Sequence, residues 1–418
     1  MGRDEWRAFI AAYLGWALDA MDAMLYSLVI VAIMREFSLN TAQAGFLASL
    51  TFLAAGAGAW LWGILADRIG RTKAMIFGIL FYATGTLLCG LAPNVLWLGV
   101  FRVIVGLGVG GEWGTGAALL AETWPASLRA KALAFMQSGF AVGYALGALV
   151  TALVMPHFGW RGVFFVGFVP ALITLWIRTA VKEPELWQRM QRQERETLTG
   201  KVGLTGGLTR SVAGGSFGEL WTRPFIRTTI GLFLYGFLSL FAYYAVFTWL
   251  PGYMATPVEK GGPGLSIVKS ATWMMVIQMG ALVGYITYGY LADWIGRRWS
   301  SVFYLIIGAI MVPLFVTIRE PSLLLVAGPI LALGGHGYVA GFGTIAGELY
   351  PTRMRATAQG FLYGSGRWAS GVAPWVVGWL ALKYKLGGAM LIASGGWLLA
   401  AICLLIFIRE TKGTVLTE

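Results

Sequence analysis

The sequence has few charged residues, and this scarcity excludes an ordinary water-soluble domain. Asp, Glu, Lys and Arg make up 12% of the 418 residues, whereas soluble domains carry about 25%. Hydrophobic residues make up 58%, and the mean hydropathy is +0.72. The 58 glycines and 19 tryptophans also fit a membrane protein, because transmembrane helices are rich in Gly and bilayer interfaces are rich in Trp. The chain is therefore predicted to cross the membrane several times.

Cysteine and histidine are also scarce. Cys89 and Cys403 both lie in apolar segments, and His157 and His336 lie on different predicted spans. Such isolated residues predict neither a disulfide nor a metal site, and no cofactor is expected. The chain also lacks a serine-centred elbow that could work with a histidine. An enzyme embedded in the membrane is therefore not expected.

Long apolar runs define the predicted architecture. A bilayer core about 30 Å thick requires about 20 apolar residues in a helix. Twelve runs qualify: 9–34, 41–66, 74–92, 95–121, 130–155, 161–178, 225–250, 270–292, 300–318, 322–349, 356–382 and 387–408. The predicted fold class is all-α and polytopic, with a six-helix bundle at 1–178, a polar cytoplasmic linker at 179–224 and a second six-helix bundle at 225–418.

The distribution of Lys and Arg predicts the orientation. Far more of them fall in the segments that share a side with the N-terminus than in the segments on the other side. Basic residues favour the cytoplasmic side, so the chain is predicted to lie in the cell inner (plasma) membrane with both termini on the cytoplasmic side. The net charge of +12 is then explained by an anionic lipid leaflet rather than by nucleic acid. The protein is expected to work as a monomer.

Two motifs occur twice. GILADRIGRTK, starting at Gly63, returns as GYLADWIGRRW at Gly289, and ETWPASLRA, starting at Glu122, returns as ELYPTRMRA at Glu348. Both pairs are separated by 226 residues, which indicates an internal duplication. Equivalent motifs lie on the same predicted membrane side, so the repeat is parallel, as in transporters whose halves are related by an axis along the membrane normal.

These motifs resemble those of the major facilitator superfamily, and the resemblance covers essentially the whole chain. RVIVGLGVGGE, starting at Arg102, is similar to the fourth-span pattern of that superfamily. The first half is most similar to the sialate:proton symporter family, which includes lactate and other monocarboxylate permeases. The matching segments are LDAMD, GGEWG, ETWPASLRAKALAFMQSGFAVG and GWRGVFF. The match to metabolite:proton symporters of dicarboxylates and osmolytes is weaker.

The resemblance implies a secondary active transporter that works by alternating access. Its expected activity is proton-coupled uptake of a small organic anion such as sialic acid or a monocarboxylate. Proton symport of dicarboxylates, aromatic acids or sugars remains an alternative, as does uniport. Sodium coupling is less favoured, because the spans contain no dense cluster of oxygen ligands.

The charges of the repeated motifs lie at predicted cytoplasmic helix ends. A carboxylate there can face the positive N-terminus of a neighbouring helix and pair with Arg. We expect a latch that closes this side in one state, a role that the resemblance supports. Its predicted members are Asp67, Arg68, Arg71, Glu122, Arg129, Asp293, Arg297, Glu348 and Arg355. The alternative is that they only cap helices and set topology. The second copy has Trp294 in place of Arg68, which predicts a weaker latch.

Two acids interrupt the first apolar run. Asp19 and Asp22, in GWALDAMDAM, lie about 16–21 Å into the span and share one helix face. An ionised Asp at a span centre costs roughly 2.5–3.5 kcal/mol, unless it faces a wet cavity, pairs with a cation or takes up a proton. The alternative is a structural hydrogen bond from a neutral Asp. The resemblance points to Asp22 and Arg102 as the proton-coupling pair, with Asp19 or Glu112 as a second titrating group.

Arg367 is the other unusual cation, in the predicted eleventh span. It could hold a substrate carboxylate with two parallel hydrogen bonds. Alternatively, it pairs with Glu348 or extends to the membrane surface. Further candidates for the cavity are His336, Tyr243, Tyr244, Gln278, Gln137, Tyr144, Trp16 and Trp113. Each is a weak candidate alone, because residues of these types within spans are more often packing residues.

Overall fold

The computed structural model describes residues 2–124, 126–169, 172, 176–177, 180–183, 188, 217–318 and 320–412. These residues form helices and no β-strand. The first half contains α1 (Arg3–Glu36), α2 (Thr41–Ile69), α3 (Arg71–Gly90), α4 (Val95–Val109), α5 (Glu112–Thr123) and α6 (Ala126–Val166). The second half contains α9 (Ile226–Phe247), α10 (Leu250–Met254), α11 (Ile267–Ile295), α12 (Arg297–Thr317), α13 (Pro321–Gly337), α14 (Phe342–Leu349), α15 (Thr352–Met390) and α16 (Ile392–Phe407). Three short 3₁₀ helices, η1 (Phe217–Trp221), η2 (Val258–Lys260) and η3 (Tyr338–Gly341), complete the elements.

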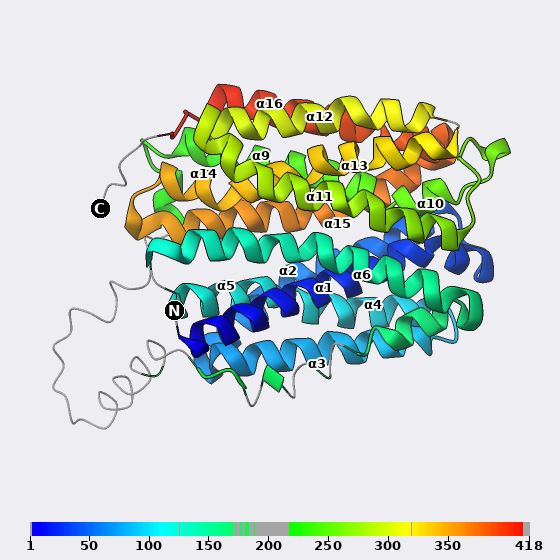
Figure 1. Cartoon of the computed structure of the whole chain (residues 1–418), viewed down its shortest axis with the longest axis horizontal. Coiled ribbons are helices and arrows are strands. Elements are labelled where there is room, and N and C mark those ends of the chain that lie inside the picture. The colour runs from blue at the N-terminus through cyan, green and yellow to red at the C-terminus, as the bar shows by residue number, and fades with distance from the viewer. Residues whose placement is uncertain are drawn as a thin grey trace.

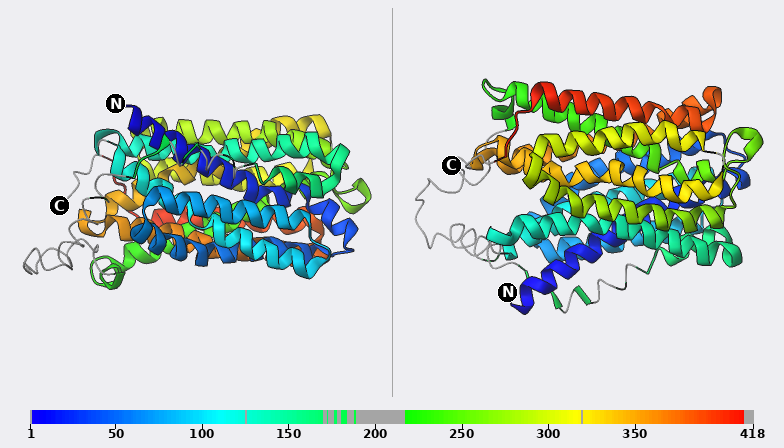
Figure 2. Two further views of the ribbon diagram at one scale, coloured as in Figure 1. Left: turned by 90° about the horizontal axis from the view of Figure 1, so that it is seen from below. Right: turned by 45° about the horizontal axis from the view of Figure 1, so that its top comes forward.

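The long helices run side by side in two groups (Figure 1). α1–α6 form the lower group and α9–α16 the upper one, and the other views keep this division (Figure 2). Both chain ends lie at one end of the molecule, which we call the terminal end. α10 lies at the opposite end, which we call the α10 end.

Nine helices of the described residues are long and apolar enough to cross a membrane, and a tenth span is added if the bent pair Gly366–Met390 and Ile392–Phe407 counts as one. The predicted fourth span is divided into α4 and α5, and the predicted tenth into α13, η3 and α14. The predicted sixth span, 161–178, runs partly over residues outside the described ranges. Most of the predicted linker at 179–224 also lies outside them, so the domain division stays a prediction.

The two halves repeat their backbone breaks at the 226-residue spacing of the sequence motifs. α2 and α11 end at Ile69 and Ile295, and α6 and α15 begin at Ala126 and Thr352. The turns after α2 and α11 are made by Gly70 at φ 111° and Gly296 at φ 102°, where a side chain would be strained. This agreement supports the internal duplication that the sequence motifs predicted.

Most helix starts and kinks are explained by the local sequence, but the kink at Lys385 is not. Long apolar helices form because a spanning segment must satisfy its own backbone hydrogen bonds. Asn40 and Ser266 accept hydrogen bonds from backbone N–H groups in the first turns of α2 and α11, and such caps fix where a helix begins. The kink inside α6 falls at Gly159, with φ 62° and ψ −170°, while the kink inside α15 falls at a non-glycine residue, Lys385, with φ 58° and ψ 165°.

The halves meet most closely at the α10 end and midway along the helices. The hydroxyl of Thr41 on α2 donates a hydrogen bond to the Gly378 carbonyl on α15 over 2.7 Å. Gly45 of α2 lies directly against the Pro374 carbonyl, with no room for a Cβ atom. Nearer the terminal end, Gly63 of α2 and Gly289 of α11 would meet no described atom within 4 Å of an added Cβ. The described contacts of Thr41 and Gly45 therefore close the seam between the halves at the α10 end.

Candidate functional site

A central cavity lies between the two halves, midway along the helices. Its empty volume is ≈ 440 Å³. α1 and α6 supply its wall in the first half, while α9, α11, η3 and α15 supply the wall in the second half. The lining residues are Trp16, Gln137, Phe140, Leu240, Tyr243, Tyr244, Tyr285, Val339, Gly366, Arg367 and Ser370. Five of the predicted substrate residues are thus brought together, from segments far apart in the sequence.

Arg367 is the cation that lines this cavity. Its guanidinium makes no hydrogen bond and no ion pair within 4.0 Å with any residue that the structure describes. Glu348, the partner that the sequence allowed, instead pairs with Arg297, with 3.3 Å between Oε1 and Nε. It also accepts a 2.5 Å hydrogen bond from the Thr411 hydroxyl. The salt bridge of Arg367 to Glu348 is therefore not formed, and a ligand anion can take that place.

Aromatic rings form most of the remaining cavity wall. The Trp16 ring lies 5.5 Å from that of Phe140, and the rings of Tyr243 and Tyr244 are 4.9 Å apart at an angle of 81°. Phe140 of α6 also meets Tyr243 of α9 at 6.2 Å, so the contact crosses between the halves. Aromatic faces and edges favour flat apolar ligand groups. The cavity therefore combines flat walls with one positive charge.

His336 lies behind the cavity wall rather than on it. It is completely buried, and its Nδ1 is 2.9 Å from the Ala332 carbonyl oxygen. A carbonyl can only accept, so this nitrogen carries the proton, and in the neutral ring Nε2 accepts from the Tyr243 hydroxyl at 3.0 Å. The geometry matches the packing alternative for His336, and its contact with the cavity passes through Tyr243.

Three other predicted residues also have roles outside the lining. The Tyr144 hydroxyl donates a 2.7 Å hydrogen bond to the Phe247 carbonyl, which joins the two halves. The Trp113 indole N–H donates to Oε1 of Gln137 over 3.1 Å, so Trp113 meets the cavity through that residue. Gln278 is buried in a separate hollow between α6 and α11. Only their mid-span depth, not their orientation, could be read from the sequence.

The predicted proton-coupling residues form a buried group in the first half. Asp19, Asp22, Arg102 and Glu112 are each 1–2% exposed. Gly110 and Gly111 break the predicted fourth span, and Glu112 is the first residue of the new helix, α5. A carboxylate is favoured at a helix N-terminus by the helix dipole.

Glu112 reaches the first helix directly. Its carboxylate lies against Gly15 of α1, where a Cβ would overlap it. The missing side chain of Gly15 therefore makes room for an acid from another helix. This contact places Glu112 beside the helix that carries both aspartates.

Asp22 and Arg102 are electrostatic neighbours, but no ion pair within 4.0 Å joins them among the described contacts. The Arg102 guanidinium instead lies 4.3 Å from the centre of the Tyr26 ring. The Thr86 hydroxyl is a polar neighbour of the Asp22 carboxylate. No hydrogen bond of good geometry from a described residue reaches either carboxylate oxygen of Asp22 or of Glu112. Buried polar groups normally have partners, so these acids stand out from the packing around them.

Asp19 connects this buried group to the cavity. It interacts electrostatically with Arg367 of the second half, and Glu112 interacts with it in turn. A ligand carboxylate at Arg367 would therefore alter the field at Asp19. Arg367, Asp19 and Glu112 are thus consecutive electrostatic neighbours from the cavity to the buried acids.

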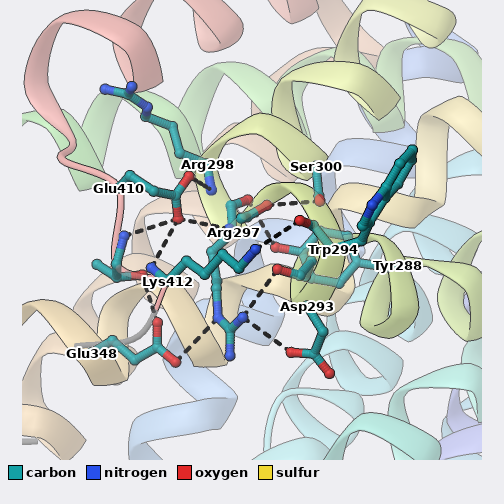
Figure 3. A network of polar contacts seen from close by, with 12 residues as sticks. Tyr288, Asp293, Trp294, Arg297, Arg298, Ser300, Glu348, Glu410 and Lys412 are labelled. Carbon is teal, nitrogen blue, oxygen red and sulfur yellow. Dashed lines mark hydrogen bonds and ion pairs between the residues drawn. The ribbon is translucent and has the colours of Figure 1, made fainter. Parts of the chain in front are cut away.

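A polar network links helix ends of the second half at the terminal end of the molecule (Figure 3). Arg297 holds Asp293 at 3.0 Å in addition to Glu348. The backbone N–H groups of Arg297 and Arg298, at the start of α12, donate to the Glu410 carboxylate at 2.8 and 3.2 Å. The contacts visible in the figure all lie within the second half.

The first half has a related arrangement. Glu183 accepts hydrogen bonds from the backbone N–H groups of Thr72 and Lys73, at 3.2 and 3.1 Å, near the start of α3. Arg71 donates to the Ala66 carbonyl at 3.0 Å, and Arg68 is exposed. The side chains of four predicted latch residues lie outside the described part of the structure: Asp67, Glu122, Arg129 and Arg355. The weaker second latch therefore stays a prediction.

Glu183 and Glu410 are residues that the sequence reasoning missed. Each follows the last apolar run of its half, at nearly the repeat spacing. Aligning the two halves beyond the apolar runs could have identified them. Their partners lie more than a hundred residues away, so spacing along one helix gave no signal.

Comparison with known proteins identifies the family. The sequence model of the Major Facilitator Superfamily matches residues 12–268 and 264–417. A putative metabolite transport protein of Haemophilus influenzae is 33% identical over 98% of both chains. The putative niacin/nicotinamide transporter NiaP of Bacillus subtilis is 30% identical over 97% of this chain and 96% of its own. The sialic acid transporter NanX of Escherichia coli is 29% identical over 93% and 90%.

Solved structures agree on the fold. The xylose transporter XylE of E. coli, in a partially occluded inward open conformation, superposes with a TM-score of 0.76 over 99% of this chain and all of its own, at 19% identity. The predicted all-α polytopic fold class is thus confirmed, as is the resemblance of the repeated motifs to this superfamily. The chain belongs to the Major Facilitator Superfamily of membrane transporters.

Proposed function

We propose that the protein is a proton-coupled symporter that takes up a small, flat organic monocarboxylate by alternating access. The observation that carries this proposal is Arg367, set among aromatic rings in the central cavity, with no hydrogen bond or ion pair within 4.0 Å to a described residue. One arginine fork matches one carboxylate. Relatives named as niacin/nicotinamide and sialic acid transporters are consistent with a carboxylate-bearing substrate.

Proton coupling is assigned to the buried acids of the first half. Asp22 exchanges the proton against Arg102, and Asp19 and Glu112 share its field. A substrate carboxylate at Arg367 weakens the attraction that this cation exerts on Asp19, so the binding of anion and proton becomes linked through their charges. This linkage favours symport over uniport.

Alternating access is assigned to the two ends of the molecule. The terminal end would face the cytoplasm and the α10 end the outside of the inner (plasma) membrane, an orientation that the Lys and Arg distribution supports. The contacts of Thr41 and Gly45 with α15 close the outer end. The networks around Arg297 and Arg71 would lock the cytoplasmic end in the opposite state. The transporter would work as a monomer.

Uptake by purified protein in liposomes tests this function. The substrates are paired acids and neutral analogues: nicotinate with nicotinamide, and benzoate with benzamide, with xylose as the neutral sugar. We expect an imposed inward proton gradient to accumulate at least one acid and none of its neutral analogues. Accumulation of amides or xylose in preference to the acids would contradict the anion assignment. Equal uptake with and without the proton gradient would indicate uniport.

A further inference from the structure

A second hollow lies at the closed α10 end, at the seam between the halves. Residues of α1 and α2 form one side, and the segment from Trp249 to Lys260 together with α15 forms the other. Its lining residues are Val31, Met34, Arg35, Leu39, Thr41, Trp249, Gly252, Ala255, Thr256, Pro257, Glu259, Lys260, Ala381, Lys385 and Leu386. We call this hollow the α10 vestibule. Its empty volume of ≈ 1220 Å³ exceeds the ≈ 440 Å³ of the central cavity.

Trp249 separates the vestibule from the central cavity. Its ring fills the space beside Gly45 of α2 and Gly378 of α15, where added Cβ atoms would lie close to it. Its indole N–H donates to the Pro374 carbonyl over 2.9 Å. Tyr244, earlier on the same segment, lines the central cavity. Neighbouring turns of one segment thus face the two hollows, with Tyr244 at the central cavity and Trp249 at the vestibule.

The vestibule carries an excess of positive charge. Arg35, Lys260 and Lys385 line it, while Glu259 is the acid among its lining residues. Within the described ranges, none of the three cations has an ion pair within 4.0 Å. Closing the α10 end brings Arg35 of one half toward the lysines of the other, which costs repulsion unless an anion intervenes.

Lys385 is placed there by a strained backbone. Its φ of 58° and ψ of 165° fall in a region that essentially only glycine adopts without strain. The residue at the equivalent kink of the first half is Gly159, with nearly the same dihedral angles. A glycine would thus satisfy the fold at 385. The surrounding structure holds this strained conformation, and Lys385 lines the vestibule.

We propose that the α10 vestibule is a recruitment site for the carboxylate of the transported anion, with Lys385, Lys260 and Arg35 as its binding groups. The inference rests on the proposed uptake of an organic anion from the α10 side. The cations would raise the anion's local concentration at the closed entrance, and the apolar floor around Trp249 and Leu386 would receive its carbon skeleton. The phosphate of an anionic lipid shares this chemistry, so the test must separate the two sources.

The test measures initial uptake of the acid that the wild-type protein accumulates, in phosphatidylcholine vesicles at low salt. Lys385→Gln should raise KM about threefold or more without changing kcat, because exposed charges act mainly on encounter. The defect should shrink as salt rises and shortens the range of the attraction. Lys385→Arg, which keeps the charge, should restore KM.

Two further variants isolate the site. Lys383→Gln is the matched control, because Lys383 is exposed nearby, lies 5.2 Å from the Tyr384 ring and does not line the vestibule. Its KM should stay at the wild-type value. Lys385→Gly should show the same KM defect as Lys385→Gln but a higher melting temperature, because it removes the backbone strain. This pairing separates the anion role of the side chain from its structural effect.

Three outcomes overturn the inference. If Lys385→Gln and Lys383→Gln have equal KM at every salt concentration, the vestibule does not recruit the anion. If the Lys385 defect appears only when phosphatidylglycerol is added to the vesicles, the site binds lipid instead. If the wild-type protein accumulates no carboxylate in either vesicle, the proposed function fails first, and the inference fails with it. Normal anion uptake together with an unchanged KM refutes the vestibule alone.

Discussion

The two halves of this transporter share one backbone plan but place different chemistry on it. In the first half, the break in the fourth span is followed by Glu112, which packs against Gly15 of the helix that carries both aspartates. In the second half, the equivalent break falls near His336, whose ring is fully used by Ala332 and Tyr243. The first half therefore has buried charged residues at this break, whereas the second half has hydrogen bonds between uncharged groups at the equivalent break.

The cavity shows the reverse distribution. Arg367 and most of the aromatic lining come from the second half, while the first half contributes Trp16, Gln137 and Phe140. A duplication therefore does not require equal roles. The comparison suggests a proton-handling half and an anion-handling half, joined where Asp19 interacts with Arg367. The following predictions test this division.

The largest effect is expected from Asp22→Asn. This change fixes the neutral form of a residue that is 1% exposed and lies between Thr86 and Arg102 in their effect on its charge. Proton-driven accumulation should fall to background, while counterflow exchange of the same acid should remain measurable. Both assays use the same preparation of proteoliposomes.

Asp19→Asn is the companion variant and should show a milder loss of accumulation. The two aspartates share one helix face and one environment, so the pair controls for general disturbance of α1. If both Asn variants still accumulate the acid with normal proton coupling, the first half's aspartates do not carry the proton, and Glu112 becomes the leading candidate.

Removing the cation of the second half should affect substrate binding rather than proton use. Arg367→Ala should weaken anion binding by about 2–5 kcal/mol, the usual loss when one partner of a desolvated charge pair is truncated. Arg367→Lys should restore only part of it, because an ammonium lacks the planar fork. Equilibrium binding of the labelled acid measures both, and unchanged affinity in a folded Ala variant would remove Arg367 from the site.

Adding one methyl group at the seam between the halves, by Gly45→Ala, should prevent the halves from closing at the α10 end. Gly45→Ala places a Cβ onto the Pro374 carbonyl and against Trp249, so the α10 end should no longer close and transport should fall about tenfold. Ser49 of α2 is buried at this seam and accepts a 3.2 Å hydrogen bond from the Trp375 N–H of α15. After Cys89→Ser and Cys403→Ser, a Ser49→Cys reporter should therefore react faster with a membrane-impermeant maleimide in the Gly45→Ala variant.

Gly56→Ala is the control on the same helix, because its Cβ would meet no described atom within 4 Å. It should transport and label like the wild-type protein. Should Gly45→Ala also behave like the wild-type protein, closure of the α10 end does not depend on this contact.

The smallest effect is expected at the helix starts that the two halves share. Glu410→Gln and Glu183→Gln each weaken a carboxylate that accepts two backbone N–H groups. Each should destabilise the protein by about 0.5–2 kcal/mol, the range measured for lost helix caps, as seen in melting temperature. The free energies should be similar in the two halves. A much larger loss for Glu410 would indicate that the network around Arg297 and Glu348 depends on it.

The sequence alone determined the class, the repeat and the candidate charges of this protein. Transfer of a side chain into lipid is a property of that residue and its near neighbours, so apolar runs and intramembrane acids can be recognised without a structure. Helix starts at Asn40 and Ser266 and turns at Gly70 and Gly296 are equally local. For the same reason, the 226-residue spacing of the motifs reappears in the helix ends.

Only the tertiary structure decided which polar groups face one another. Helix rotation and tilt place His336 behind Tyr243, turn Tyr144 toward Phe247 and lay Arg102 over Tyr26 instead of against Asp22. They also leave Arg367 without an ion pair within 4.0 Å among the described residues and bring Glu410 back to the start of α12. These outcomes depend on packing between segments that lie far apart in the chain, and period and composition along one helix carry no record of that packing.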